Sequence, residues 1–147
     1  MLIHLAWITP LLLLLFFLGS PRFRGDIAER RVGRILAAGL ERKRYTVLSD
    51  LVLPFGGGTV RIDHAVVSKY GIFVIESVYA PGVVSGTAVQ ERWKRKRFGR
   101  IHRFDNPVHG NRVQVEALAS ALEFPMTVFE PVVVLVGTQA VREPRPG

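Results

Sequence analysis

Two acidic residues interrupt a stretch of sequence that otherwise has the pattern of a hydrophobic β-hairpin. The stretch is Arg61–Val78, with the sequence RIDHAVVSKYGIFVIESV and a predicted turn at 68–71. Asp63 lies in its first strand and Glu76 in its second strand. A carboxylate among buried strands costs free energy unless it is paired or binds a metal ion. A fold of this chain must therefore contain the hairpin and give both acids a partner.

Strand alternation predicts that the two acids meet. Residues two apart on a strand share a face, so Arg61 lies beside Asp63 and His64 points away from both. In the simplest register, Asp63 and Glu76 converge across the hairpin. Two close carboxylates repel each other unless a hard cation lies between them, and Mg²⁺, with Mn²⁺ as the alternative, suits such ligands. The pattern predicts a metal site at Asp63 and Glu76; the alternative is that these acids face water.

Composition limits the classes of site and partner. The 147 residues have room for one domain with a core, and there is no cysteine. A disulfide partner, a thiolate zinc site and a cysteine nucleophile are therefore excluded. The 20 Lys and Arg residues against 12 Asp and Glu residues give a net charge of +8. This balance favours anionic partners, either nucleic acid or an anionic membrane surface.

Nearly all of the excess positive charge comes from one segment, residues 92–103. Interleaved aromatic residues, Trp93, Phe98 and Phe104, suit stacking on bases. Part of the segment, 91–98, has the pattern of a basic strand or an extended arm. Contact with anionic lipid and a merely solvated surface are the alternatives to nucleic-acid binding. The residues predicted to bind nucleic acid are Arg92, Lys94, Arg95, Lys96, Arg97 and Arg100, with Arg103 completing the run.

Residues 1–19, MLIHLAWITPLLLLLFFLG, carry no charged side chain. Their length is just sufficient for a membrane helix, and Pro10 is tolerated there. A cleaved signal peptide is the alternative, but the segment lacks a basic start and a small-residue cleavage site. Arginines follow directly, which places the rest of the chain on the cytoplasmic side. We expect a single-pass membrane protein, with the N-terminal helix in the membrane and the domain facing the cytoplasm.

Beyond the anchor we expect a linker at 20–25, a domain at 26–138 and a tail at 139–147. A helix is predicted to begin at Gly25-Asp26, with Asp26 as its N-cap. Glu29 lies three residues later and completes a capping box. Capping and a role in the site are therefore both open for Glu29.

The remaining pattern predicts an α/β fold. Asn106 and Pro107 mark the N-cap and first residue of a second helix, which ends at 124–125. The order helix, three strands, basic segment, helix, strand predicts a mixed sheet flanked by helices. The last strand is an apolar run typical of a strand covered on both faces. The predicted strands are 45–53, 61–67, 72–78 and 132–136, with a turn at 54–58 and a break at 80–82.

The hairpin and its flanks resemble a known family. The segment IDHAVVSKYGIFVIES is similar to the core motif of the NERD (nuclease-related) domain, and AERRVGRIL, YTVLSDLVLP and FDNPVHGNRVQVEAL fit its flanks. The resemblance covers Phe23 to Val136. It implies the αβββαβ fold of PD-(D/E)xK nucleases, to which the NERD domain is similar. It also implies that Asp63 and Glu76 bind a metal ion and that Glu29 supports the ion or its water.

Three positions depart from the family pattern. Val78 stands where the family has a lysine that orients the attacking water or neutralises developing charge. Arg61 and Gly110 each replace a glutamine of the family. Arginine stays protonated, so Arg61 could stabilise charge but would be a poor base. It could equally neutralise Asp63 in an ion pair that needs no metal.

Together these features predict a membrane-anchored, Mg²⁺-dependent nuclease with a degenerate site. The catalytic residues would be Asp63, Glu76, Glu29 and Arg61, and the basic segment would hold the nucleic-acid backbone. The alternative is a catalytically inactive module that binds nucleic acid or a membrane surface. Val78 separates the two predictions, because valine cannot do the chemistry of the missing lysine.

Overall fold

The computed structural model of the protein describes residues 21–142. The predicted membrane anchor at 1–19 and the end of the predicted tail lie outside this range. Within residues 21–142, no helix combines the length and the apolar character that a membrane span needs.

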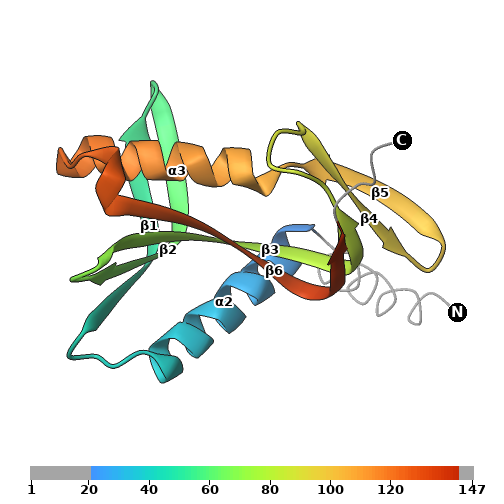
Figure 1. Ribbon diagram of the computed structural model, residues 1–147, viewed down its shortest axis with the longest axis horizontal. Helices are drawn as coiled ribbons and strands as arrows, with labels where there is room; N and C mark the ends of the chain where they lie inside the picture. The colour runs from blue at the N-terminus through green and yellow to red at the C-terminus, as the bar shows by residue number, and fades with distance from the viewer. Residues whose placement is uncertain (1–20, 143–147) are drawn as a thin grey trace, which may run out of the picture.

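Six strands form one mixed sheet, which Figure 1 shows together with two long helices. Five of them lie in the order β1-β2-β3-β4-β5, each antiparallel to the next. The sixth, β6, pairs in parallel with β3. The predicted α/β fold with a mixed sheet and flanking helices is therefore confirmed. The strands are β1 (Tyr45–Phe55), β2 (Gly58–Ser68), β3 (Gly71–Ser85), β4 (Arg92–Arg97), β5 (Arg100–Asp105) and β6 (Phe129–Arg142).

The two helices build separate parts of the core. The helix α2 (Pro21–Gly39) packs on β2, β3 and β6 through the buried residues Ala28, Val32, Val66, Ile75 and Val136. The helix α3 (Pro107–Leu122) packs on the sheet through Ile62, Ala65, Ile72, Val74, Val115, Leu118, Ala119 and Phe129. Burying apolar side chains under each helix is the main force that holds these layers together.

The first helix begins earlier than its capping pattern predicts. Residues 21–25 of the predicted linker are already helical, so the predicted start at Gly25-Asp26 is wrong. Gly25 lowers helix propensity by about 1 kcal/mol without ending the helix. Glu29 lies in the body of α2, which excludes the capping box.

The third strand is longer than predicted. The predicted break at 80–82 is wrong, because β3 continues to Ser85. Its register with β6 shifts around Gly82, and Gly82 has a φ of 108°, so the strand passes through a bulge. A Cβ at Gly82 would clash with the carbonyl oxygen of Lys96. Glycine therefore lets β4 approach β3 here.

The basic segment forms a second hairpin instead of an extended arm. Strands β4 and β5 pair from Arg92↔Asp105 to Arg97↔Arg100. At the turn, Phe98 and Gly99 both have positive φ, as tight hairpin turns require. Figure 1 shows this hairpin projecting at one end of the molecule. Its base is fixed by Trp93, which packs with Ala80 and Val84.

The second helix begins where the sequence predicts. The Oδ1 atom of Asn106 accepts a hydrogen bond from the N–H of Val108, and Pro107 is the first helical residue. The Nδ2 atom of Asn106 also donates to three carbonyls of the 87–90 loop. The predicted strand 132–136 lies within β6, but most of its side chains are half-buried, so the predicted cover on both faces is incomplete.

Candidate active site

The candidate site lies in a gap beside the central strand. Strand β6 pairs with β3 along nearly its whole length. On the opposite edge of β3, β2 pairs with residues 71–75 and β4 pairs with residues 83–85. Within the described chain, residues 76–82 therefore have no strand partner on that edge. Glu76, Ser77 and Val78 lie in this gap.

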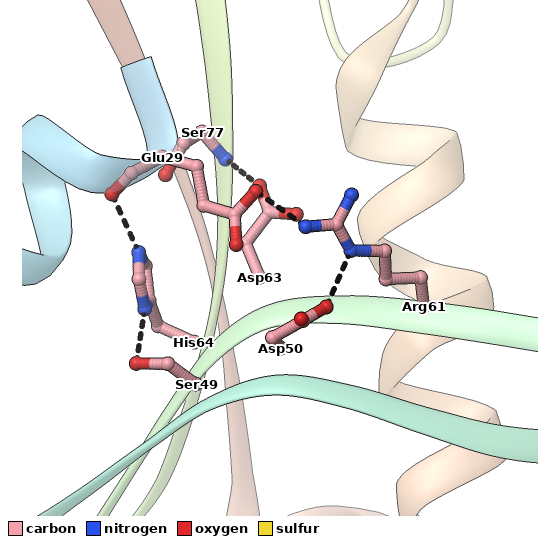
Figure 2. Close-up of polar contacts among 7 residues, drawn as sticks. All are labelled: Glu29, Ser49, Asp50, Arg61, Asp63, His64 and Ser77. Atoms are coloured by element: carbon pink, nitrogen blue, oxygen red, sulfur yellow. Dashed lines mark hydrogen bonds and ion pairs between the residues drawn. The ribbon is translucent and has the colours of Figure 1, made fainter. Parts of the chain in front are cut away.

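Asp63 lies at the end of the gap where β2 separates from β3. The β2–β3 register ends at His64↔Ile75. Beyond it, the N–H of Ser77 donates a hydrogen bond of 2.8 Å to Oδ2 of Asp63, as Figure 2 shows. The side-chain carboxylate takes the place of a carbonyl of the ladder, so the N–H is satisfied although the strands separate.

The backbone opposite Asp63 is irregular. The β1–β2 pairing keeps its register on both sides of Asp50 and Asp63, but these two residues do not pair, and Asp50 has a φ of 54°. Aspartate tolerates this left-handed conformation better than most residues. Strict alternation fails here, since Ile62 and Ala65, three residues apart, belong to one core cluster.

Glu76 has a carboxyl group without a hydrogen-bond donor. Its Oε2 atom is buried and has no partner among the described residues. Burial, and then the negative charge of Asp63, raise the pKa of Glu76 to about 7. A Cβ at Gly110 on α3 would lie 3.3 Å from this oxygen. Because Gly110 has no side chain, it cannot offer the donor that the glutamine of the family pattern would offer.

Arg61 bridges two other acids. Its Nη2 atom lies 2.7 Å from Oε2 of Glu29, and its Nε atom lies 2.8 Å from Oδ1 of Asp50. Figure 2 shows this guanidinium between the two carboxylates. Within residues 21–142 it forms no ion pair with Asp63, so the predicted alternative of an Arg61–Asp63 pair is wrong. Burial and the nearby Asp63 raise the pKa of Glu29, although Arg61 opposes this.

His64 ties α2 to the sheet beside this network. Its Nε2 atom donates to the carbonyl oxygen of Glu29 at 3.0 Å, and its Nδ1 atom lies 2.8 Å from the hydroxyl oxygen of Ser49. A Cβ at Gly33 would lie 2.9 Å from the imidazole. His64 and Asp63 thus both approach Glu29, contrary to the prediction that they point apart. His64 fixes the position of Glu29 through its backbone.

The acids border an open cleft of about 420 Å³. Glu29, Arg61, Asp63 and Ser77 line it, together with Gly25 and Asp26 from α2. In the part of the chain that the structure describes, no group of three or more His, Asp or Glu side chains is arranged to hold a metal ion. Mg²⁺ needs fewer protein ligands, because it binds through one or two carboxylates and keeps several waters. Asp63 lines this cleft and Glu76 does not, but the two carboxylates lie close enough for the charge of Asp63 to raise the pKa of Glu76.

Val78 lies in a second cleft, of about 380 Å³. This cleft shares Gly25 and Ser77 with the first one. Its far wall belongs to the basic hairpin, including Arg95 and His102. Val78 also packs against the cluster of Ala80, Val84 and Trp93. The site therefore has an apolar surface where the family pattern has a cation.

Two residues of this network carry little signal in the sequence. Asp50 could have been noticed as an acid within the strand pattern YTVLSDLVLP, but its left-handed backbone is not visible there. Ser77 contributes a backbone N–H, which any residue except proline would supply. The predicted nucleic-acid residues, in contrast, all lie on the second hairpin, away from Asp63 along the sheet.

Comparison with known proteins identifies the family of the chain. The family described as the nuclease-related domain, NERD, matches residues 24–136. The chain belongs to the NERD family. The NERD domain is similar to PD-(D/E)xK nucleases, as the motif indicates. The match includes α3, all of α2 except its first three residues, and all of the candidate site residues.

One curated relative of this NERD protein is the uncharacterized protein pXO1-01 of Bacillus anthracis. The two are 32% identical over 117 residues, which cover 76% of this chain and 55% of the relative. The chain thus spans about half the length of that relative. No solved structure matches it.

Proposed function

We propose that this NERD protein hydrolyses phosphodiester bonds of nucleic acid, with Mg²⁺, or Mn²⁺ as an alternative, held by Asp63 and Glu76. The observation that carries the proposal is the carboxyl group of Glu76. It is buried beside Asp63, one of its oxygens has no donor, and its pKa is raised to about 7. An acid in this position binds a proton or a cation.

Each residue then has a separate task. Bound Mg²⁺ would activate a water and stabilise the charge that develops on the phosphodiester. Asp63 is held in place for this by the N–H of Ser77, and Glu29 is positioned by His64 and Arg61. Arg61 can stabilise negative charge but cannot accept a proton. Val78 offers neither charge nor a proton, so we expect slow hydrolysis.

We propose that the protein lies in a membrane, with its folded domain on the cytoplasmic side. The uncharged apolar segment 1–19 and the arginines after it support an uncleaved single-pass anchor. The nuclease domain would then work beside the membrane.

Metal binding by the full-length protein in non-ionic detergent tests the proposal. Calorimetry should detect Mg²⁺ and Mn²⁺ binding, and Asp63→Asn and Glu76→Gln should each abolish it. Glu116→Gln, an exposed acid-to-amide change on α3, is the matched control and should bind as the wild type does. Metal-dependent cleavage of an oligonucleotide should follow the same pattern. Equal metal binding by all four proteins would contradict the proposal.

A second candidate function is binding of nucleic acid without cleavage. Val78 favours it, because the position of the missing lysine is filled by a side chain of an apolar cluster. The fold and the basic hairpin would then be kept without the chemistry. Nucleic-acid binding with no metal-dependent cleavage would identify this case.

A further inference from the structure

The second hairpin has two chemically different faces. On β4, Trp93, Arg95 and Arg97 share one face, and Lys94 and Lys96 share the other. Trp93 is only 8% exposed and packs on the sheet, so its face is the inner one. The cross-strand partners on the inner face are Phe104 for Trp93, His102 for Arg95 and Arg100 for Arg97. The inner face thus carries a row of cations that leads from Trp93 to the turn.

Arg95 is the innermost of these cations. It is half-buried, and within residues 21–142 no acid forms an ion pair with it. It lines the second cleft across from Val78, together with His102. A partly buried guanidinium without an acidic partner is a natural binding point for an anion.

Three neighbouring clefts follow one another along the sheet and share lining residues. The second cleft meets the acid-lined cleft at Gly25 and Ser77. On its outer side, Arg95 and His102 also line a hollow that extends to Arg97, Phe98 and Arg100. Phe98 at the turn is 88% exposed. The path therefore runs from Glu29 and Asp63, past Val78, along the inner cations and out to an exposed aromatic ring.

We propose that this inner face binds the phosphate backbone of a nucleic-acid strand, with Arg95 supplying beside Val78 the positive charge that a lysine there would supply. This inference rests on the proposed function, because that function places the reacting phosphodiester bond at the acids where the path begins. Single strands bind by charged grooves and stacked aromatic rings, which the inner cations and Phe98 offer. A membrane fits less well, because a bilayer surface cannot enter the cleft where Arg95 lies.

Two double variants with the same loss of charge test the proposal. The inner pair is Arg95→Gln with Arg97→Gln. The matched outer pair is Lys94→Gln with Lys96→Gln on the same strand, two of the predicted nucleic-acid residues that this inference excludes from the contact because they lie on the other face. Binding of fluorescent oligodeoxythymidylate to the full-length protein in non-ionic detergent is measured over a range of salt, with EDTA present to prevent cleavage. Losing two phosphate contacts should lower the slope of log K against log salt by about 1.4, at about 0.7 for each contact. The inner pair should show this loss, and the outer pair should keep nearly the whole slope.

The outcomes separate this inference from the proposed function. Binding that depends on the inner face, without cleavage when Mg²⁺ is added, supports the path and contradicts the nuclease. If the two double variants lose the same amount of salt dependence, the proposed path is wrong, whether or not cleavage occurs. No oligonucleotide binding by the wild type, with retention on phosphatidylserine vesicles but not on phosphatidylcholine vesicles, would overturn it in favour of a lipid surface.

Discussion

At position 76 the chain keeps an acid where the protein around it favours a neutral group. The Glu76 carboxyl has Gly110 on one side and the negative charge of Asp63 nearby, and neither donates a hydrogen bond to it. Most proteins replace such a group or pair it, because an unpaired buried charge costs several kcal/mol. Its presence is explained if a cation occupies the site during function.

The first prediction concerns stability and pH. The folded pKa of Glu76 is about 7 against an ordinary value of 4.5, so the folded state holds its proton more tightly than the unfolded state. In EDTA, stability should therefore fall as pH rises from about 4.5 to about 7 and level off above that. The total loss should be roughly 3 kcal/mol, at about 1.4 kcal/mol per pKa unit. Urea unfolding at several pH values measures it.

The matched variant for this prediction is Glu76→Gln, which keeps the shape and cannot ionise. It should lose most of the pH dependence and be more stable than the wild type at pH 8. Glu29, whose pKa is also raised, should leave a smaller dependence of the same sign. If Glu76→Gln keeps the same pH dependence of stability, that dependence arises from another group.

The second prediction concerns Val78→Lys. The lysine stem can keep part of the packing of Val78 while its ammonium enters the cleft. A cation beside the developing charge should raise metal-dependent cleavage on the order of 10²-fold, the size of one well-placed charge-stabilising group. Val52→Lys, the same change at an exposed position of β1, should leave cleavage unchanged. No gain with the fold intact would count against a site that lacks only its lysine.

Val78→Lys also tests the role of Arg95. If Arg95 supplies the missing charge, Arg95→Gln should lower cleavage more in the wild type than in Val78→Lys. Equal losses in the two backgrounds would mean that Arg95 and the residue at position 78 act independently.

At the level of elements, the second hairpin depends on close contact between its base and the segment before it. A Cβ at Gly86 would overlap the indole of Trp93, whose Nε1 atom donates to the carbonyl of Thr87. This ring anchors β4 to the end of β3. The position of the inner cations therefore depends on a glycine outside the hairpin.

The third prediction is that Gly86→Ala destabilises the protein by about 1–3 kcal/mol, the usual cost of overpacking a core. Thermal or urea unfolding measures it, and Trp93 should change its near-ultraviolet signal. Gly39→Ala at the end of α2 is the control, since nothing lies within 4 Å of its Cβ. A loss no larger for Gly86→Ala than for this control would mean that the loop shifts to make room.

The sequence predicts the elements better than their ends. The motif and its flanks predict the strand order, and Asn106 predicts the start of α3, because a capping side chain acts locally. The sequence pattern places the start of α2 too late, because a glycine such as Gly25 usually marks a helix boundary. In this protein Gly25 lies inside the helix. The bulge at Gly82 depends on how closely β4 approaches, which is a contact between distant segments.

The site itself is predictable only in part. Asp63, Glu76 and Glu29 can be named from the motif and its flank, but the second partner of Arg61 beside Glu29 cannot. Asp50 takes that role through a left-handed residue in β1, and nothing in the local pattern marks it. Alternation fails at the same place, because it assumes a regular strand.

For the whole molecule, the fourth prediction is that metal binding stabilises the fold. A ligand that binds only the folded state adds about 2.7 kcal/mol at one hundred times its dissociation constant. Mg²⁺ should raise the melting temperature more at pH 8 than at pH 6, because it must displace the proton of Glu76 at the lower pH. Scanning fluorimetry measures the shift, and Asp63→Asn should abolish it. The same shift in that variant would place the ion elsewhere.

The parallel pairing of β6 with β3 has a consequence for the protein during its synthesis. The ribosome makes β3 well before β6, and the whole second hairpin and α3 lie between them. Until β6 appears, β3 has one long unpaired apolar edge, and pairing between such distant segments is slow. Until then the nascent chain cannot complete the pairing of the strand that carries Glu76, and this exposed edge favours aggregation.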